Sequence, residues 1–428
     1  MLLRTISLQM GLRIASFLIF MSGIIAAFYV TEPLSIESSI YYENALYFLK
    51  HGHFVDVLNG GLYAYHPYGQ SAFIALIYSI FGHKPYIVSA VQVVLFLLIF
   101  YMFLRIIKKV DTTAAKCFMI LFPSYLIFYK YVIDLVSEIP HYFFVALGFY
   151  CFTLFVRDRY IIYLILNGFF LGIAALFKPY LFYFMIPLFL YYGYYSYKTE
   201  TPFPKKSAPL VVLSLILACS PILYKNYVEL GVFDRLTTYS GDNLFVGNYA
   251  LSKGDWVTPA YSQHYAEIHE RMQQISKNLT ELEGDNAFRR EALVIIKDNF
   301  SLFVKKCLLQ AGILLSWSGY EVFFFKARYH FLYYTLYVIL AIYGLICFPR
   351  KYFHIRNMMI LHITYCLSVF SIMFAHSRLK DTMAIFIVFF ASIGLANILR
   401  KIEKYYNRKL EQKDCTEETS VPQIKKIV

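Results

Sequence analysis

The chain has 428 residues, of which 59% are hydrophobic and 16% charged, and its formal net charge is +13 at pH 7. An ordinary soluble domain carries roughly 45–50% apolar and about 25% charged residues, so this composition excludes a water-soluble globular protein. The apolar residues gather in runs long enough to cross a hydrocarbon core of about 30 Å. Much of the positive charge lies between these runs, which indicates membrane topology and not nucleic-acid binding.

We predict an all-α polytopic membrane protein with about ten transmembrane helices. The predicted spans lie near residues 14–30, 86–104, 117–133, 139–156, 160–177, 179–197, 208–224, 331–348, 358–375 and 381–399. Lys and Arg are concentrated at one set of span ends, which the positive-inside bias assigns to the cytoplasm. Both termini then lie inside, and we expect a multi-pass protein of a bacterial inner membrane whose active site faces the periplasm or outside.

The predicted spans and the polar segments between them divide the chain into four parts. These are an N-terminal transmembrane module at 1–224 with a first outer loop at 31–85, an outer-face region at 225–330, a three-helix transmembrane module at 331–400, and a basic cytoplasmic tail at 401–428. The tail after Tyr405 is charged and poor in apolar residues, so we expect it to be disordered.

Two outer segments are apolar but too short to span a membrane. Residues 69–81 place Phe73, Ile77, Ile80 and Phe81 on one helical face. Residues 300–317 are apolar apart from Lys305 and Lys306. We expect both segments to be helices that lie in the membrane interface.

The first outer loop carries the most informative pattern. Ser35 suits a helix N-cap and no breaker follows before Gly52, which predicts a helix. On this helix Glu37, Tyr41 and Asn44 fall at positions i, i+4 and i+7 and form one polar stripe. Glu37 lies in the first turn, where the helix dipole favours an ionised carboxylate, as a base or a metal ligand requires. The alternative is a glutamate that only satisfies the helix start, and spacing alone leaves both open.

A second acid and a group of cations share the outer side. Glu138 opens a predicted span, where an ionisable group is costly and usually paired or functional; the alternative is a side chain that reaches water. Outward cations run against the positive-inside bias, and they form charge-assisted bonds to phosphate. The candidates for binding a donor phosphate are Lys178, Arg378, Lys380, Lys130 and Arg235. Each alone could be a membrane anchor, so the argument rests on the group.

The order of these pieces resembles the GT-C superfamily of integral-membrane glycosyltransferases, in particular the bacterial branch related to protein mannosyltransferases and to the aminoarabinose transferase of lipid A. After the first span the family has an acid, a Tyr four residues later, an Ala, a Gly, and a turn before a short helix that ends in Phe-Gly. The corresponding residues here are Glu37, Tyr41, Ala45, Gly52, the segment HPYG that begins at His66, and Phe81-Gly82.

Further pieces of the family pattern follow in order between about residues 10 and 400. They are Ser137-Glu138, LNGFFLGIAALFKPY, KNYVELGVF, SGDNLFVGNYALSKGDW and Arg378-Leu379-Lys380. The chain departs from the pattern at three places. It has Glu37 where the family usually has Asp, Tyr68 between the Pro and Gly of the turn, and Lys380 in place of a second Arg.

The resemblance implies a sugar donor carried on a polyprenyl phosphate and an inverting transfer to an acceptor hydroxyl. Glu37 would then be the base, Glu138 would assist it or position the acceptor, and the cations would stabilise the departing phosphate. Candidates for sugar or acceptor contacts are Tyr41, Asn44, His66, Asn243 and Asn248. The expected partners are the lipid-linked sugar, membrane lipids and a glycan, lipid or protein acceptor. No spacing identifies a metal site, although carboxylates leave room for a divalent cation, and no cofactor is identified.

Three other functions stay open from the sequence. A transporter or lipid flippase would also be basic and polytopic, but would show paired halves or charges at the membrane midplane. A polysaccharide polymerase or ligase would use lipid-linked sugars and give Glu37 no special role. A scaffold without chemistry would leave the outward cations unexplained. Convergence of Glu37, Glu138 and Arg378 in space would favour the glycosyltransferase.

Overall fold

A computed structural model describes residues 8–28, 35–125, 127–197, 203–254, 264–316, 327–373 and 381–418. Within these ranges the secondary structure is helical, with no β-strand and one isolated bridge between Asp56 and Leu62. The predicted all-α polytopic fold is therefore confirmed.

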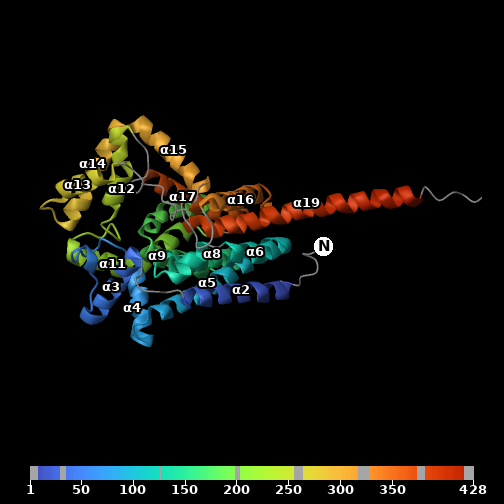
Figure 1. Cartoon of the computed structure of the whole chain (residues 1–428), viewed down its shortest axis with the longest axis horizontal. Coiled ribbons are helices and arrows are strands. Elements are labelled where there is room, and N and C mark those ends of the chain that lie inside the picture. The colour runs from blue at the N-terminus through green and yellow to red at the C-terminus, as the bar shows by residue number, and fades with distance from the viewer. Residues whose placement is uncertain are drawn as a thin grey trace, which may run out of the picture.

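Most of the long helices run side by side along one axis (Figure 1). They are α2 (Leu8–Phe28), α5 (Pro85–Val110), α6 (Thr112–Ser124), α7 (Ile127–Ile133), α8 (Glu138–Asp158), α9 (Ile162–Phe177), α10 (Met185–Tyr197), α11 (Ser207–Leu230), α16 (Ala327–Ile346), α17 (Phe353–Ile372) and α19 (Ala384–Glu418). A continuous core of buried aliphatic and aromatic side chains joins these helices.

A second group of helices gathers at one end of this bundle, opposite the end from which α19 projects (Figure 1). The group contains α3 (Ile36–His51), α4 (Gly69–Phe81), α12 (Ser240–Asn248), α13 (Tyr265–Ser276), α14 (Glu281–Asp298) and α15 (Phe300–Ser316). Short 3₁₀ turns complete the chain: η1 (Val57–Asn59), η2 (Pro179–Phe184), η3 (Tyr249–Lys253), η5 (Arg350–Tyr352) and η6 (Asp381–Met383). The described helices of residues 31–85 and 225–330 thus lie at the same end of the bundle, and the side of the membrane that they face stays a prediction.

Five helices in the described ranges are long and apolar enough to cross a membrane. They are α5, α8, α11, α17 with its preceding turn, and α19 with its preceding turn. The pair α6 and α7 would make a sixth span that is bent by 56° just after Pro123, since proline disrupts helical hydrogen bonding. Helices coincide with all ten predicted spans, but α9 and α10 are short, so the count of ten stays a prediction.

Two details of the sequence prediction are wrong. The tail is helical and not disordered from Tyr405 as far as Glu418, because its residues are good helix formers and include no Gly or Pro. The predicted apolar face of α4 is also split. Ile77 is buried in a cluster with Tyr41, whereas Ile80 and Phe81 are exposed, since α4 packs against both α3 and α9. The predicted helices at 69–81 and 300–317 do form.

Close packing between α9 and α11 depends on two small residues one helical turn apart. A Cβ atom added at Gly168 or Gly172 would lie under 3.0 Å from the carbonyl oxygens of Val211 or Leu215 on α11. The two backbones therefore approach more closely than larger side chains would allow, as is common between membrane helices.

Replacing Gly168 with Ala should lower the melting temperature of the purified protein in detergent, because overpacking typically costs about 1–3 kcal/mol. Gly193→Ala on α10 is the matched control. It has no neighbouring atom within 4 Å of its added Cβ, and Ala is the better helix former, so its melting temperature should be unchanged or slightly higher. An unaffected Gly168→Ala variant would contradict the close contact.

Candidate active site

The helix that carries Glu37 forms as the local sequence predicts. Ser35 caps α3 by accepting a hydrogen bond from the backbone N–H of Ser38 at 3.3 Å, and Gly52 ends the helix with a φ of +78°. Glu37 lies in the first turn, is half-buried, and accepts a hydrogen bond of 3.0 Å from the hydroxyl of Tyr41. The predicted stripe therefore contains a real acid–phenol contact.

The start of α3 is fixed against the segment between α7 and α8. The hydroxyl of Ser35 donates to Asp134 at 2.9 Å, and the hydroxyl of Ser38 donates to the same carboxylate. Asp134 stands four residues before Glu138 in the chain. This contact holds the first turn of α3, and Glu37 with it, beside the start of α8.

Glu138 and Lys178 form a buried ion pair at that end of the bundle. The ammonium of Lys178, at the end of α9, donates to Glu138 Oε1 at 2.8 Å, and Glu138 is fully buried. Tyr41 lies close to this pair. Burial raises the pKa of Tyr41, and the charge of Glu138 raises it further. Glu37, Tyr41, Glu138 and Lys178 therefore come from three helices and meet in one place.

A further acid, Asp381, lies close to this group. It is fully buried, accepts a hydrogen bond of 2.6 Å from the hydroxyl of Tyr131, and is close enough for its charge to act on Glu138. Asp381 is not among the site residues predicted from the sequence. Its position directly after Lys380, at the start of an apolar segment, is the signal that could have identified it.

His66 belongs to a second polar group in the first outer loop. Its Nδ1 atom pairs with the buried carboxylate of Asp56, whose other oxygen accepts a hydrogen bond of 3.0 Å from Asn59. The ring of His66 lies 5.5 Å from that of Tyr239, between centroids. Asp56 and Tyr239 also act on the pKa of Tyr41, so this group borders the one around Glu37.

The first outer loop is held against the 225–330 region by hydrogen bonds to carboxylates. Tyr65 donates to Asp242 at 2.5 Å, and burial raises the pKa of Asp242. Glu281, in the first turn of α14, accepts from the backbone N–H groups of Tyr63 at 2.7 Å and Ala64 at 2.9 Å. These contacts place α12 and α14 over the loop that carries His66.

Two of the residues predicted to contact the sugar or acceptor, Asn44 and Asn248, make hydrogen bonds within the fold. Asn44 is buried and its Oδ1 atom accepts a hydrogen bond of 2.9 Å from the backbone N–H of Val57, which holds the loop around Asp56. Asn248 is buried at the end of α12, where it contacts Lys306 and the carbonyl oxygen of Ile372. Asn243 is half-buried on α12.

Arg235 is buried and forms ion pairs with two carboxylates. Its guanidinium donates to Asp285 at 2.7 Å and to Asp234 at 2.9 Å. Lys130 is half-buried on α7. Arg378 and Lys380 lie outside the described residues, so convergence of Arg378 with the acids stays a prediction. Among the described residues, no three His, Cys, Asp or Glu side chains are placed to hold a metal ion.

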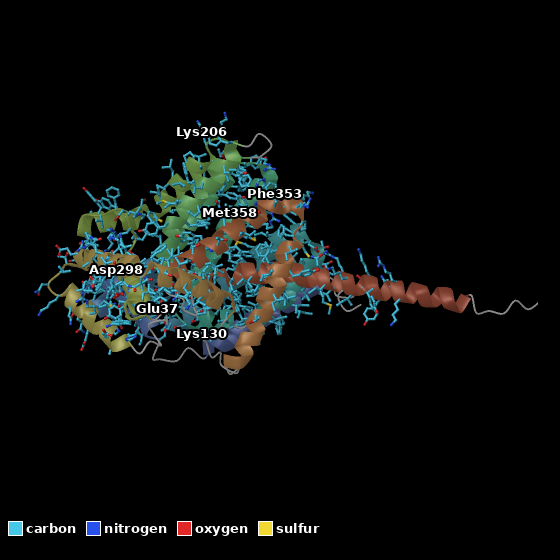
Figure 2. All side chains as sticks on the ribbon, turned by 90° about the horizontal axis from the view of Figure 1, so that it is seen from above. Glu37, Lys130, Lys206, Asp298, Phe353 and Met358 are labelled. Atoms are coloured by element: carbon cyan, nitrogen blue, oxygen red, sulfur yellow. The ribbon has the colours of Figure 1, made fainter. Side chains whose placement is uncertain are left out.

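Figure 2 shows where this group lies in the molecule. Glu37 is at the end occupied by α14, which carries Asp298, whereas Phe353 at the start of α17 lies toward the end from which α19 projects. Glu37, the acid predicted from the first outer loop, thus lies at the same end of the bundle as α14.

Comparison with known proteins gives a family match to part of the chain. Residues 65–224 match the family described as dolichyl-phosphate-mannose-protein mannosyltransferase. This segment includes His66, α4, and both partners of the Glu138–Lys178 pair. No curated protein matches the sequence of the chain.

Among solved structures, the chain resembles the oligosaccharyltransferase AglB from Archaeoglobus fulgidus. AglB in complex with an inhibitory peptide and a dolichol-phosphate is 13% identical, with a TM-score of 0.57 over 95% of this chain and 52% of that chain. The apo form is 12% identical, with the same TM-score and coverage. The chain thus spans about half the length of AglB, and the likeness is one of fold.

A weaker likeness is to ArnT from Cupriavidus metallidurans bound to undecaprenyl phosphate. It is 10% identical, with a TM-score of 0.41 over 90% of this chain and 77% of that chain.

Replacing Arg235 with Met should destabilise the protein by about 1.5–3 kcal/mol, because Asp285 loses a hydrogen bond from its closest cation while it keeps those from Arg289 and the Gly241 N–H. Arg271→Met is the matched control, since Arg271 on α13 makes an exposed ion pair with Glu291 on α14 and such pairs contribute about 0–1 kcal/mol. Thermal unfolding of both variants in detergent measures the difference. If Arg235→Met retains the wild-type melting temperature but loses activity, Arg235 binds substrate after all.

Proposed function

We propose that the chain is a glycosyltransferase of the GT-C type and that it transfers a sugar from a polyprenyl-phosphate donor to an acceptor hydroxyl. The family match at residues 65–224 and the likeness in fold to AglB support this proposal. The observation that carries this proposal is the meeting of Glu37 and Tyr41 with the buried Glu138–Lys178 pair. An ionisable acid beside an ammonium, at one end of a membrane bundle, supplies both a base and a partner for a phosphate.

Glu37 is the base in the proposed reaction. Its half-buried carboxylate takes the proton of the acceptor hydroxyl while the hydroxyl oxygen forms a bond to the anomeric carbon. The bond between that carbon and the phosphate oxygen breaks in the same displacement, so the configuration inverts. Tyr41 holds the carboxylate of Glu37 by its hydrogen bond of 3.0 Å.

The phosphate leaves with its bonding electrons and gains negative charge, which cations stabilise. Lys178 is held for this role by Glu138, whose negative charge also offsets the cost of burying the ammonium. We assign Lys130, Arg378 and Lys380 to the same role. Arg235 already forms ion pairs with Asp234 and Asp285. We therefore propose that it joins the segment after α11 to α14.

Sugar and acceptor contacts are proposed for Tyr41, His66 and Asn243, while Asn44 and Asn248 shape the surrounding backbone. We propose that the site faces the periplasm or outside, and that the donor reaches it from the membrane past the exposed apolar side chains of α4. The acceptor is a glycan, a lipid or a protein. A divalent cation stays a prediction from the sequence, and no step of the proposed reaction depends on one.

Glu37→Gln should fold as the wild type does and lose about 10²–10⁴-fold in turnover, which is the usual contribution of a general base. Transfer from radiolabelled polyprenyl-phosphate sugars to a membrane-extract acceptor measures it. Glu43→Gln, on the same helix, is the control and should retain full turnover. Wild-type turnover in Glu37→Gln would move the base elsewhere. Substrate flux in proteoliposomes without any transfer would favour a transporter.

The Glu138–Lys178 pair is best tested by removing both charges at once. Lys178→Met alone would leave Glu138 buried and unpaired, at a cost of about 3–5 kcal/mol, and is expected to yield little folded protein. Glu138→Gln combined with Lys178→Met should fold but lose about 10²–10³-fold in transfer, because the phosphate loses its ammonium. A folded double variant with full transfer would show that the pair serves only the fold.

A further inference from the structure

Three cations gather at the end of the bundle that is remote from Glu138. Arg105 and Lys109 lie in the last two turns of α5, and Arg157 lies in the last turn of α8, which packs against α5. We call these three residues the cation cluster. Since α8 has 21 residues and begins at Glu138, the cluster lies about 30 Å from the candidate active site. It is therefore a separate feature of the molecule.

The ammonium of Lys109 lies among like charges without an acceptor. Its nitrogen is out of contact with solvent and has no hydrogen-bond partner among the described residues. Arg157 and Arg105 are both close enough for their positive charges to act against that of Lys109, whereas the nearby carboxylate of Asp158 favours it. Burying a cation without a partner is costly, so the surroundings of Lys109 are suited to a bound anion.

The carboxylate of Asp158 does not balance the cluster. Both of its oxygens already accept hydrogen bonds from the guanidinium of Arg157, and the three cations exceed this one carboxylate by two charges. Arg105 and Lys109 are four residues apart on α5, a spacing at which like charges destabilise a helix. The helix dipole favours cations near the end of a helix, but it supplies no acceptor for Lys109.

Two tyrosines border the cation cluster. The hydroxyl of Tyr101, one turn before Arg105 on α5, accepts a hydrogen bond of 2.7 Å from Arg105 Nε. Tyr150 on α8 is half-buried and close enough to act on both Arg105 and Arg157, so it lies near the two guanidinium groups. Tyrosine is enriched where a membrane protein meets the lipid headgroups. The cluster therefore has the surroundings of a headgroup site.

An apolar stripe on α5 leads to the cation cluster. Val94, Leu98 and Tyr101 are 53%, 43% and 41% exposed, and with Arg105 they follow one another at intervals of three or four residues. Such residues share one face of a helix. An anion held at Arg105 would therefore have apolar surface beside it on the same helix, which suits a phosphate that carries acyl chains and gives nothing to a free phosphate ion.

We propose that the cation cluster binds the phosphate of an anionic phospholipid, whose acyl chains lie along the stripe of Val94, Leu98 and Tyr101. Lysine and arginine make charge-assisted hydrogen bonds to phosphate, and basic sites between membrane helices bind anionic headgroups in this way. The bound phosphate supplies the acceptor that Lys109 lacks and joins the end of α5 to the end of α8. The inference does not depend on the proposed function.

The experiment titrates phosphatidylglycerol into the purified full-length protein in a neutral detergent and measures the melting temperature. Phosphatidylglycerol should raise it in a saturable way, because a ligand that binds the folded state stabilises that state. Phosphatidylcholine, which has no net charge, and inorganic phosphate should each raise it much less. An equal effect of phosphatidylcholine would show that the acyl chains alone bind, and an equal effect of inorganic phosphate would show a site for the free ion. Either result overturns the proposal.

Lys109→Met should raise the half-saturating concentration of phosphatidylglycerol about 10-fold, since a charged hydrogen bond to the phosphate is lost. Without added lipid its melting temperature should not fall, because the substitution also removes the repulsion from Arg105 and Arg157. Arg13→Gln is the matched control, because Arg13 is an exposed cation on α2, and it should leave the half-saturating concentration unchanged. A wild-type half-saturating concentration in Lys109→Met overturns the proposal.

Arg105→Gln keeps the proposal testable if the Lys109 variant does not fold. Arg105 is exposed, so its replacement should leave the fold intact while it also raises the half-saturating concentration of phosphatidylglycerol. A folded Arg105→Gln variant that responds to the lipid as the wild type does counts against the site, whereas a weaker response supports it.

Discussion

The ion pair between Glu138 and Lys178 is the interaction on which the arrangement of the site depends. Neither charge could be buried at the end of a membrane bundle without the other, because each would keep a desolvation cost of several kcal/mol. The pair joins the start of α8 to the end of α9. Since α9 is packed closely on α11 through Gly168 and Gly172, the ammonium is held by a rigid part of the fold.

The helices α3, α12 and α14, at one end of the bundle, depend on a second set of polar contacts, which are made by residues distant in sequence. Asp134 holds the first turn of α3, Glu281 holds the backbone at Tyr63 and Ala64, and Asp285 holds Arg235. Each carboxylate accepts several hydrogen bonds, so each joins a loop to a helix. Glu37 is half-buried and accepts a hydrogen bond from the Tyr41 hydroxyl on its own helix, whereas Asp134, Glu281 and Asp285 accept hydrogen bonds that join separate segments.

The sequence predicted those features whose signals are local. The cap at Ser35, the Gly52 terminus, and the contact between Glu37 and Tyr41 each follow from residues a few positions apart. The partners of Glu138, His66 and Lys306 could not be predicted in this way, since Lys178, Asp56 and Asn248 are brought to them by tertiary packing. The tail was predicted to be disordered because it is charged and poor in apolar residues. Its high helix propensity, which that prediction left out, explains why α19 continues to Glu418.

The polarity of α15 (Phe300–Ser316) is partly inverted, because Lys306 and Gln310 are buried whereas Phe300 and Leu308 are exposed, and this has a consequence for how the helix tolerates change. Phe300 and Leu308 can be exchanged for other apolar residues at small cost. On its inward side Lys306 must match three acceptors at once, and neither a shorter nor a neutral side chain does so. Substitutions should therefore accumulate on one side of α15 and be rejected on the other, which is the reverse of the pattern in a helix of a water-soluble protein.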